Sequence, residues 1–315
     1  MTMTIPELAE LAHRTRQVRE AGLALLLASS ILALFLFVPL GSSKRTDPDV
    51  QTVAPPVPLT VSPIDAKAAI IYDLATGEIL YEKNADAQLP LASLTKLLTV
   101  YAALTELSPQ TPITVSSLAA TAEYPHAFAA GDTLMLSDLA RLTLTASLND
   151  GAAAIAEATA AQVQSSTADM LAGAASALGL SATYAVNGSG LDLNTVVSGG
   201  YGSARDIARL AGALVERAPD VANATTFANA TAVSAKGRAY KAINTDPMTS
   251  AISRLLLSKT GYTDLAGGNL ALVFDAGIRH PVAVVVLGSS KEARFTDGIA
   301  LVNAALAHFA GVTSL

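Results

Sequence analysis

Apolar positions between residues 65 and 107 first follow the period of a strand and then that of a helix. Short apolar runs at 68–72 and 79–81 flank the Thr76–Gly77 turn, which is typical of a β-hairpin. From residue 96 on, the spacing of the apolar residues becomes helical. The same spacing recurs in a series of alanine-rich stretches, namely 137–146, 152–163, 167–179 and 203–216. The middle of the chain is therefore predicted to be helical.

Polar residues at the starts of two of these stretches indicate helix caps. Ser137 and Asp138 stand at the start of the first stretch and are cap candidates. Ser203 and Asp206 have the three-residue spacing of a capping box, in which each side chain bonds the backbone N–H of the other residue. We therefore expect helices to begin at these two places.

The last quarter of the chain returns to strand patterns. Apolar runs at 254–259, 268–276 and 280–289 are separated by glycine-containing turns and predict strands, and residues 295–309 predict a closing helix. Strands thus occur at both ends of this region and helices lie between them. We expect one sheet built from both ends of the domain, with a helical region inserted.

A stretch of 20 residues near the N-terminus, 21–40, carries no charge. This length matches the hydrocarbon core of a bilayer, about 30 Å at 1.5 Å per residue, and predicts a transmembrane anchor. The alternative is a cleaved signal peptide, but its apolar region is usually about 7–15 residues and the chain offers a poor cleavage site. Arg14, Arg16 and Arg19 predict a cytoplasmic tail at 1–20, although Lys44 and Arg45 weaken this bias.

Residues 41–64 are predicted to be an extended linker. They contain five prolines and show neither helical nor strand periodicity. A proline-rich segment of this length, at about 3.1 Å per residue, holds a folded domain up to several tens of Å from a bilayer. The folded domain is then expected at 65–315, outside the cytoplasm.

Composition excludes several classes of function. The chain has 315 residues and a net charge of −6, and nothing in this balance suggests a nucleic-acid partner. Cysteine is absent, which removes disulfides, thiolate catalysis and cysteine-ligated zinc. The four histidines are scattered, and no two have the spacing of a helical zinc site. We expect no metal and no cofactor.

One serine and one lysine stand three residues apart in the stretch LPLASLTKLLT. Of the eight lysines, only Lys96 has a serine, Ser93, at this spacing before it. A serine hydroxyl needs an adjacent base to become a nucleophile, and side chains at i and i+3 share one face of a helix. If a helix begins near Ser93, its unpaired N–H groups face a developing oxyanion. The alternative is a helix cap followed by a surface lysine.

Two further tripeptides carry hydroxyl, amide and amine groups. Ser-Leu-Asn at 147–149 lies in the expected turn between two helices, and Lys-Thr-Gly at 259–261 lies at the end of a predicted strand. Taken singly, each is also explained by ordinary helix capping or by a strand-to-turn transition. All three motifs occur once each and in this order, which indicates a catalytic site.

The three motifs, together with stretches such as NGSGLD and KTGYTDLAGGNLAL, resemble those of the penicillin-binding serine DD-peptidases. Within these, the chain is similar to the low-molecular-mass D-alanyl-D-alanine carboxypeptidases over roughly residues 65–315. The resemblance implies an α/β (α+β) fold of the β-lactamase/transpeptidase type, with an antiparallel sheet, a helical lobe and a catalytic cleft between them. At Leu148 the chain departs from the glycine that is common in the family, which leaves its substrate preference open.

The resemblance also implies roles for the residues of the first two motifs. Ser93 would attack the carbonyl between two terminal D-alanines and become acylated. Lys96, whose pKa would be lowered by a dry cleft and a second amine, would accept the serine proton. Ser147 would relay this proton to the leaving amine, and Asn149 would bind the backbone of the peptide substrate.

The third motif would hold the other end of the substrate. Lys259 and Thr260 would bind the carboxylate of the departing D-alanine, beside Gly261, which has no side chain to block the approach. The backbone N–H groups of Ser93 and Tyr262 would form the oxyanion hole. These roles, like those above, are implied by the resemblance.

The implied activity is that of a serine DD-carboxypeptidase of the bacterial cell membrane, acting on peptidoglycan stem peptides that end in D-Ala-D-Ala. β-Lactam antibiotics would acylate the same serine. Three alternatives share the fold: a DD-endopeptidase of peptidoglycan crosslinks, a serine β-lactamase and a non-catalytic peptidoglycan-binding protein. No glutamate occurs between residues 158 and 215, which disfavours a β-lactamase that activates water with this residue.

Overall fold

The computed structural model describes residues 19, 22–23 and 59–311. The chain divides into two units, 1–53 and 54–315. The anchor predicted at 21–40, apart from residues 22–23, and most of the linker predicted at 41–64 lie outside the described residues. In the described part of the chain, no helix has the length and apolar character needed to cross a bilayer.

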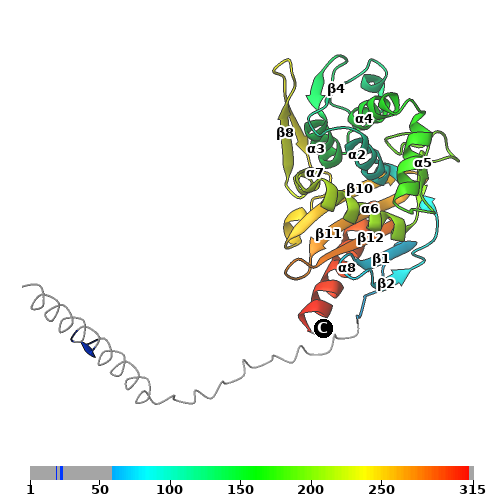
Figure 1. Cartoon of the computed structure of the whole chain (residues 1–315). Coiled ribbons are helices and arrows are strands. Elements are labelled where there is room, and N and C mark those ends of the chain that lie inside the picture. Colours follow the sequence, from blue (N-terminus) through cyan, green and yellow to red (C-terminus); the bar gives the residue numbers. More distant parts are fainter. Residues whose placement is uncertain (1–18, 20–21, 24–58, 312–315) are drawn as a thin grey trace, which may run out of the picture. The chain divides into compact units, whose positions relative to one another are not determined.

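The second unit is built on a five-stranded antiparallel sheet with the strand order β10-β11-β12-β1-β2 (Figure 1). Its strands are β1 (Ala68–Asp73), β2 (Ile79–Lys83), β10 (Leu255–Thr263), β11 (Gly267–Asp275) and β12 (Pro281–Ser289). β1 pairs with β12, so the two ends of the domain meet in the middle of the sheet. The expectation of one sheet made from both ends of the domain is confirmed.

Strand alternation gives this sheet two buried faces, because successive side chains point to opposite sides. Ile70 and Val285 belong to the core shared with the helical region, whereas Ile71 and Val284 belong to a second core. The second core is covered by α8 (Ala293–Ala310), the closing helix expected from the sequence. Figure 1 shows α8 on one side of the sheet and the helical region on the other.

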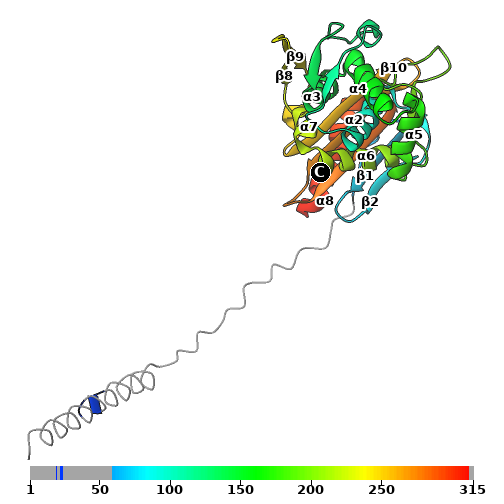
Figure 2. The ribbon, with the colours of Figure 1, turned by 45° about the horizontal axis from the view of Figure 1, so that its top comes forward.

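The helical region is arranged around α2, which is almost entirely buried. It contacts α3, α4, α5 and α6, and α6 also covers β12, β1 and β11. Figure 2 shows the same helices from a second direction, with α2 behind α4. The helices are α2 (Thr95–Glu106), α3 (Leu136–Ala146), α4 (Asn149–Gln162), α5 (Thr167–Ala177), α6 (Ala204–Arg217) and α7 (Pro219–Ala224).

Short strands and 3-10 turns complete the unit. One small sheet joins β3 (Leu89–Pro90), β7 (Gly200–Gly202) and β6 (Tyr184–Ala185), and another joins β4 (Pro112–Thr114) and β5 (Thr133–Met135). A hairpin of β8 (Asn229–Val233) and β9 (Ala239–Ile243) packs on α3. The 3-10 turns are η1 (Ala92–Leu94), η2 (Ala119–Thr121) and η3 (Thr249–Ala251).

The predicted caps of α3 are wrong. α3 begins at Leu136 after Met135, and no side chain caps it. The reason is that carbonyl oxygens of the loop between α2 and β4, those of Thr111 and Pro109, already accept the N–H groups of Leu136 and Ser137. Asp138 instead pairs with Arg141, with 3.0 Å between its Oδ1 and Nη1.

The predicted cap of α6 is confirmed in one of its two bonds. Ser203 Oγ accepts the backbone N–H of Asp206 at 3.1 Å. The Asp206 carboxylate does not turn back to Ser203, and accepts the N–H of Ala182 and the hydroxyl of Thr183, both at 2.9 Å. Asp206 therefore ties α6 to the segment before β6.

Candidate active site

Ser93 and Lys96 lie at the start of the central helix. Ser93 is in the 3-10 turn η1, and Lys96 is in the first turn of α2, which begins at Thr95. Lys96 Nζ is 2.8 Å from Ser93 Oγ. The residue before the serine, Ala92, has a φ of 48°, a left-handed conformation that is uncommon for a residue with a side chain. The turn therefore holds the Ser93 hydroxyl in a constrained position beside the Lys96 amine.

Lys96 has three hydrogen-bond partners in a fully buried site. Besides Ser93 Oγ they are Asn149 Oδ1 at 2.7 Å and the Ser189 carbonyl oxygen at 2.8 Å. Burial, and then the charge of Lys259, lower the pKa of Lys96 well below its usual range, while Asp150 opposes this shift. A neutral amine has two hydrogens and one lone pair. Because Asn149 Oδ1 and the Ser189 carbonyl accept only, the lone pair of Lys96 faces the Ser93 hydroxyl.

Ser147 occupies the turn between α3 and α4, as expected from the sequence. It is the C-cap of α3, with a left-handed φ of 59°, and its side chain is buried. Lys259 Nζ donates to Ser147 Oγ at 2.9 Å and to the Thr260 carbonyl oxygen at 2.7 Å. Burial, and then the charge of Arg294, lower the pKa of Lys259 to about 7. The cleft thus contains two amines, and the pKa of each is reduced.

Asn149 connects the two sides of the cleft. Its Oδ1 accepts from Lys96, and its Nδ2 donates to the Glu123 carbonyl oxygen at 3.0 Å, which fixes the orientation of the amide. Its backbone N–H donates to the Pro125 carbonyl oxygen at 2.7 Å. Asn149 is therefore held by the loop at 123–125 as well as by α4.

The Lys-Thr-Gly motif runs along the free edge of the sheet, because β10 has a neighbour only on the β11 side. The strand does not end at the motif, as the sequence suggested, but continues to Thr263. A Cβ atom on Gly261 would lie 2.9 Å from the Leu91 carbonyl oxygen and 3.3 Å from the Ser93 nitrogen. Only glycine lets the edge strand approach the nucleophile turn this closely.

Two residues of the site were not predicted. Ser189 supplies the carbonyl that accepts from Lys96, and Asn187 Oδ1 holds its loop by accepting the N–H groups of Ser189 and Gly190. Arg294, at the start of α8, donates from Nη1 to the Gly261 carbonyl oxygen at 2.7 Å. The stretch NGSGLD, which resembles the family and contains Ser189, could have indicated this residue. Arg294 is a single arginine in a predicted helix, and no pattern in the sequence assigns it to the site.

The structure brings all three motifs into one cleft. Ser93, Lys96 and Asn149 form one hydrogen-bonded group, Ser147, Lys259 and Thr260 form another, and Gly261 packs against the turn that carries Ser93. The charge of Lys259 acts on Lys96 across the space between the two groups. A half-buried serine hydroxyl with an amine of lowered pKa beside it is the arrangement that serine acyl transfer requires. Among residues 59–311, no cluster of histidine and carboxylate side chains is suited to a metal ion.

Comparisons with known proteins agree with this geometry. The sequence profile of the family described as D-alanyl-D-alanine carboxypeptidase matches residues 50–291. The D-alanyl-D-alanine carboxypeptidase DacC of Escherichia coli is 29% identical over 312 residues, covering 92% of this chain and 70% of the relative. A D-alanyl-D-alanine endopeptidase of Pseudomonas aeruginosa is 27% identical over 277 residues, covering 86% of each chain.

Solved structures show the same fold. A penicillin-binding protein of Listeria monocytogenes, solved in its ampicillin-bound form, superposes with a TM-score of 0.66 and is 29% identical. The match covers 78% of this chain and 99% of that one. The expected β-lactamase/transpeptidase type of fold is confirmed for the part of the chain that the match covers.

Proposed function

The chain belongs to the D-alanyl-D-alanine carboxypeptidase family, and we propose that it removes the terminal D-alanine from peptidoglycan stem peptides through an acyl-enzyme on Ser93. The observation that carries this proposal is the 2.8 Å contact between Ser93 Oγ and Lys96 Nζ. The two other partners of this amine can only accept hydrogen bonds, which leaves its lone pair for the serine proton. The remaining residues of the cleft supply the other functions of the reaction.

In the acylation step, Ser93 Oγ attacks the carbonyl carbon between the two D-alanines and gives its proton to the neutral amine of Lys96. The charge that develops on the carbonyl oxygen is held by the backbone N–H groups of Ser93 and Tyr262, each worth about 3–4 kcal/mol. The bond between carbon and nitrogen breaks when Ser147 relays this proton from Lys96 to the leaving amine, which returns Lys96 to its neutral form. Free D-alanine departs, and the peptide stays on Ser93 as an ester.

Deacylation repeats these steps with water as the nucleophile. Lys96 accepts a proton from the water as it attacks the ester, and the Ser93 oxygen leaves and recovers a proton.

The other residues of the site bind the substrate. Lys259 and Thr260 bind the carboxylate of the departing residue during acylation, because an ammonium and a hydroxyl both donate to carboxylate oxygens. Asn149 binds the peptide backbone and, through Oδ1, keeps Lys96 in place.

The proposal is tested with the purified domain and a pentapeptide that ends in D-Ala-D-Ala. We expect release of D-alanine, and loss of this release in Ser93→Ala. Mass spectrometry after incubation with benzylpenicillin is expected to show one added acyl group on the peptide that contains Ser93. Binding of the pentapeptide without release of D-alanine would instead favour a non-catalytic peptidoglycan-binding protein.

A β-lactamase would turn over benzylpenicillin rapidly. Rapid turnover requires activation of water against the penicilloyl ester, and residues 158–215 contain no glutamate for this step. Glu157, just before this range, accepts the Ser116 hydroxyl at 2.6 Å. We therefore expect the penicilloyl adduct to persist, and rapid hydrolysis of benzylpenicillin would contradict this part of the proposal.

We further propose that residues 21–40 anchor the protein in the cell membrane, with the catalytic domain outside the cytoplasm. The charge-free length of this stretch and the arginines before it support the proposal. Membrane fractionation and the intact mass of the protein from cells test it. Retention of the N-terminal residues in the membrane fraction is expected, and a soluble chain that lacks residues 1–40 would show that the segment is a cleaved signal peptide.

A further inference from the structure

Thr260, which is proposed to bind the departing carboxylate, has a hydroxyl partner on a neighbouring segment. Its Oγ1 is 2.6 Å from the Oγ1 of Thr245, which lies between β9 and η3. Thr260 is 4% exposed, and Thr245 is half-buried. Among the residues that the structure describes, each of these hydroxyl groups has the other as its one hydrogen-bond partner. The direction of this bond therefore decides which hydroxyl has a free hydrogen.

A carboxylate in this part of the cleft requires the free hydrogen to be on Thr260. The Lys259 ammonium has three hydrogens. Two of them are donated to Ser147 Oγ and to the Thr260 carbonyl oxygen, which leaves one for a substrate. Since a carboxylate has two oxygens, the Thr260 hydroxyl would supply the second donor. If Thr260 donated to Thr245 instead, the lone pairs of its oxygen would face the carboxylate and repel it.

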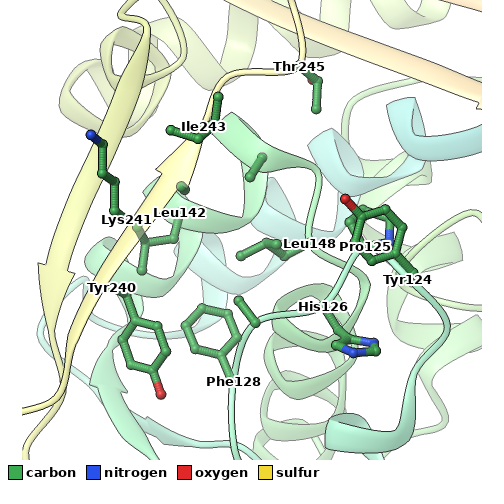
Figure 3. Close-up of a pocket in the computed structure, with 13 residues that line it drawn as sticks. Tyr124, Pro125, His126, Phe128, Leu142, Leu148, Tyr240, Lys241, Ile243 and Thr245 are labelled. Carbon is green, nitrogen blue, oxygen red and sulfur yellow. The ribbon is translucent and has the colours of Figure 1, made fainter.

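The surroundings of Thr245 favour donation from Thr245 to Thr260. Figure 3 shows Thr245 together with Leu148 and Ile243 around an apolar pocket of about 350 Å³. The side chains of Leu148 and Ile243 have no acceptor for the Thr245 hydrogen. This hydrogen is paired when it points to Thr260 Oγ1, and it is unpaired when it points to the apolar wall. The Thr260 hydrogen is then left for the cleft.

The segment that carries Thr245 is held from two sides. The backbone N–H of Thr245 donates to the Thr145 carbonyl oxygen, near the end of α3, at 3.2 Å. On the other side, Ser258 Oγ donates to Asp246 Oδ2 at 2.6 Å. Ser258 and Thr260 are both on β10, so two side-chain bonds tie the segment to the catalytic strand. The Thr245 hydroxyl is therefore in place before a substrate binds.

We propose that Thr245 is a positioning residue of the carboxylate site. It donates its hydroxyl hydrogen to Thr260 Oγ1, and this directs the Thr260 hydrogen to the carboxylate of the departing residue. The inference rests on the proposed function. A hydroxyl that accepts a hydrogen bond is polarised and becomes a stronger donor, so Thr245 acts on the carboxylate without touching it. Loss of the Thr245 hydroxyl should thus weaken recognition of the carboxylate and leave the groups around Ser93 unchanged.

The test uses two activated substrates that differ only in the carboxylate. Both are thioesters of N-acylated D-alanine, with thioglycolate as the leaving group in one and the methyl ester of thioglycolate in the other. In each, Ser93 attacks the thioester carbon, the carbon–sulfur bond breaks and the thiolate departs. We expect kcat/KM of the native protein to be about ten-fold or more higher for the thioglycolate thioester, because hydrogen bonds to charged groups are the stronger ones.

Thr245→Val replaces the hydroxyl with a methyl group. It is expected to lower kcat/KM for the thioglycolate thioester by about five-fold, the effect of losing one neutral hydrogen bond, and to leave kcat/KM for the methyl ester unchanged. Thr245→Ser keeps the hydroxyl and should restore the preference of the native protein. Thr114→Val is the matched control, because Thr114 Oγ1 and Thr133 Oγ1 form the same kind of pair, at 2.8 Å, between β4 and β5. It is expected to keep the native preference.

A double-variant comparison separates action through Thr260 from direct contact with the substrate. If Thr245 acts through Thr260, the variant that combines Thr245→Val and Thr260→Val has the kcat/KM of Thr260→Val alone. Additive losses would mean that Thr245 binds the carboxylate itself, and would overturn the inference. An equal fall for both thioesters in Thr245→Val would also overturn it, since this variant would then have a general structural defect.

The native protein separates failure of the inference from failure of the proposed function. Release of D-alanine from the pentapeptide and acylation of Ser93 are measured on the same samples. If both are present and Thr245→Val keeps the native preference for the thioglycolate thioester, the positioning role is wrong and the proposed function stands. If D-alanine is not released and Ser93 is not acylated, the proposed function itself has failed.

Discussion

Lys96 Nζ lies 2.8 Å from Ser93 Oγ, and its two other partners, Asn149 Oδ1 and the Ser189 carbonyl oxygen, can only accept hydrogen bonds. A neutral amine in this position has both hydrogens engaged and its lone pair directed at the serine hydroxyl. This geometry fits the proposed role of Lys96 as the base that removes the serine proton. The burial that lowers the pKa of Lys96 also favours its neutral form.

The first prediction concerns Lys96 as the base. Lys96→Arg keeps a positive charge but provides no lone pair, since a guanidinium is always protonated in proteins. We expect the rate of acylation by benzylpenicillin to fall by about 10²–10⁴-fold, the usual contribution of general base catalysis. Stopped-flow or mass spectrometry at fixed times measures this rate. Lys236→Arg, at an exposed lysine that lines neither the catalytic site nor the pocket beside it, serves as the control and is expected to acylate normally. Equal rates in the two variants would exclude Lys96 as the base.

The second prediction is a fall of activity at high pH. The pKa of Lys259 is lowered to about 7, so its ammonium is present below this pH and is lost as the pH rises through it. Loss of this charge weakens the binding of the departing carboxylate. We expect kcat/KM for a peptide ending in D-Ala-D-Ala to decrease as the pH rises above about 7, because kcat/KM reports groups of the free enzyme.

The same pH profile gives the control for Lys259. Lys259→Arg keeps its charge across the whole range, so the decrease above about pH 7 is expected to disappear, whatever the absolute activity of the variant. Lys96 becomes protonated as the pH falls through its lowered pKa, and the loss of activity that this causes is expected to remain in Lys259→Arg. A variant that keeps the decrease at high pH would assign it to another group.

Local patterns predicted most of the fold. The hairpin at 68–83, the helices and the three late strands have strong apolar periodicity, and the structure has elements at all of these places. The hairpin β8-β9 was not predicted, because its buried positions are alanines, such as Ala230 and Ala242, which give little contrast with polar neighbours. The predicted caps of α3 are wrong for another reason. Carbonyl groups of the loop between α2 and β4, which is distant in sequence, accept the first N–H groups of this helix.

The three motifs were found in the sequence, but two features of their surroundings were not. Ser189 acts through its carbonyl oxygen, and no side-chain pattern reveals a backbone acceptor. The pocket beside Leu148 is formed by segments as distant as Phe128 and Ile243, and only the folded chain brings them together. The sequence thus predicted the candidate reactive groups, whereas the structure was needed for the residues that orient them and for the space beside them.

The third prediction concerns the close approach at Gly261. In Gly261→Ala the new Cβ would lie 2.9 Å from the Leu91 carbonyl oxygen, so β10 must move away from the turn that carries Ser93. Because this moves the Tyr262 N–H, we expect acylation by benzylpenicillin to slow by about 10²-fold, the effect of losing one oxyanion donor. Gly173→Ala is the control, since no atom lies within 4 Å of the added Cβ in α5. It is expected to raise the free energy of unfolding by about 0.5–1 kcal/mol and to leave acylation unchanged. Acylation of Gly261→Ala at the normal rate would show that the strand has room there.

The last prediction concerns Arg294, a positioning residue. The residue is 7% exposed, and its Nη1 donates to the Gly261 carbonyl oxygen at 2.7 Å. This carbonyl belongs to the same planar peptide group as the N–H of Tyr262, and the two point in opposite directions in a trans peptide. Holding the carbonyl therefore fixes the direction of this N–H, which we propose to bind the developing oxyanion. The charge of Arg294 also lowers the pKa of Lys259.

Replacement of Arg294 should thus have two effects that a simple loss of stability would not produce. Arg294→Ala is expected to lower the acylation rate constant by about 10–10²-fold, with little change in the affinity of the first complex, because only the transition state uses the Tyr262 N–H. It should also move the decrease in kcat/KM to a pH above about 7, since removal of a nearby cation raises the pKa of Lys259. Arg294→Lys restores the charge and is expected to return the pH profile toward that of the native protein. A variant that unfolds more easily but keeps both the rate constant and the pH profile would assign Arg294 a purely structural role.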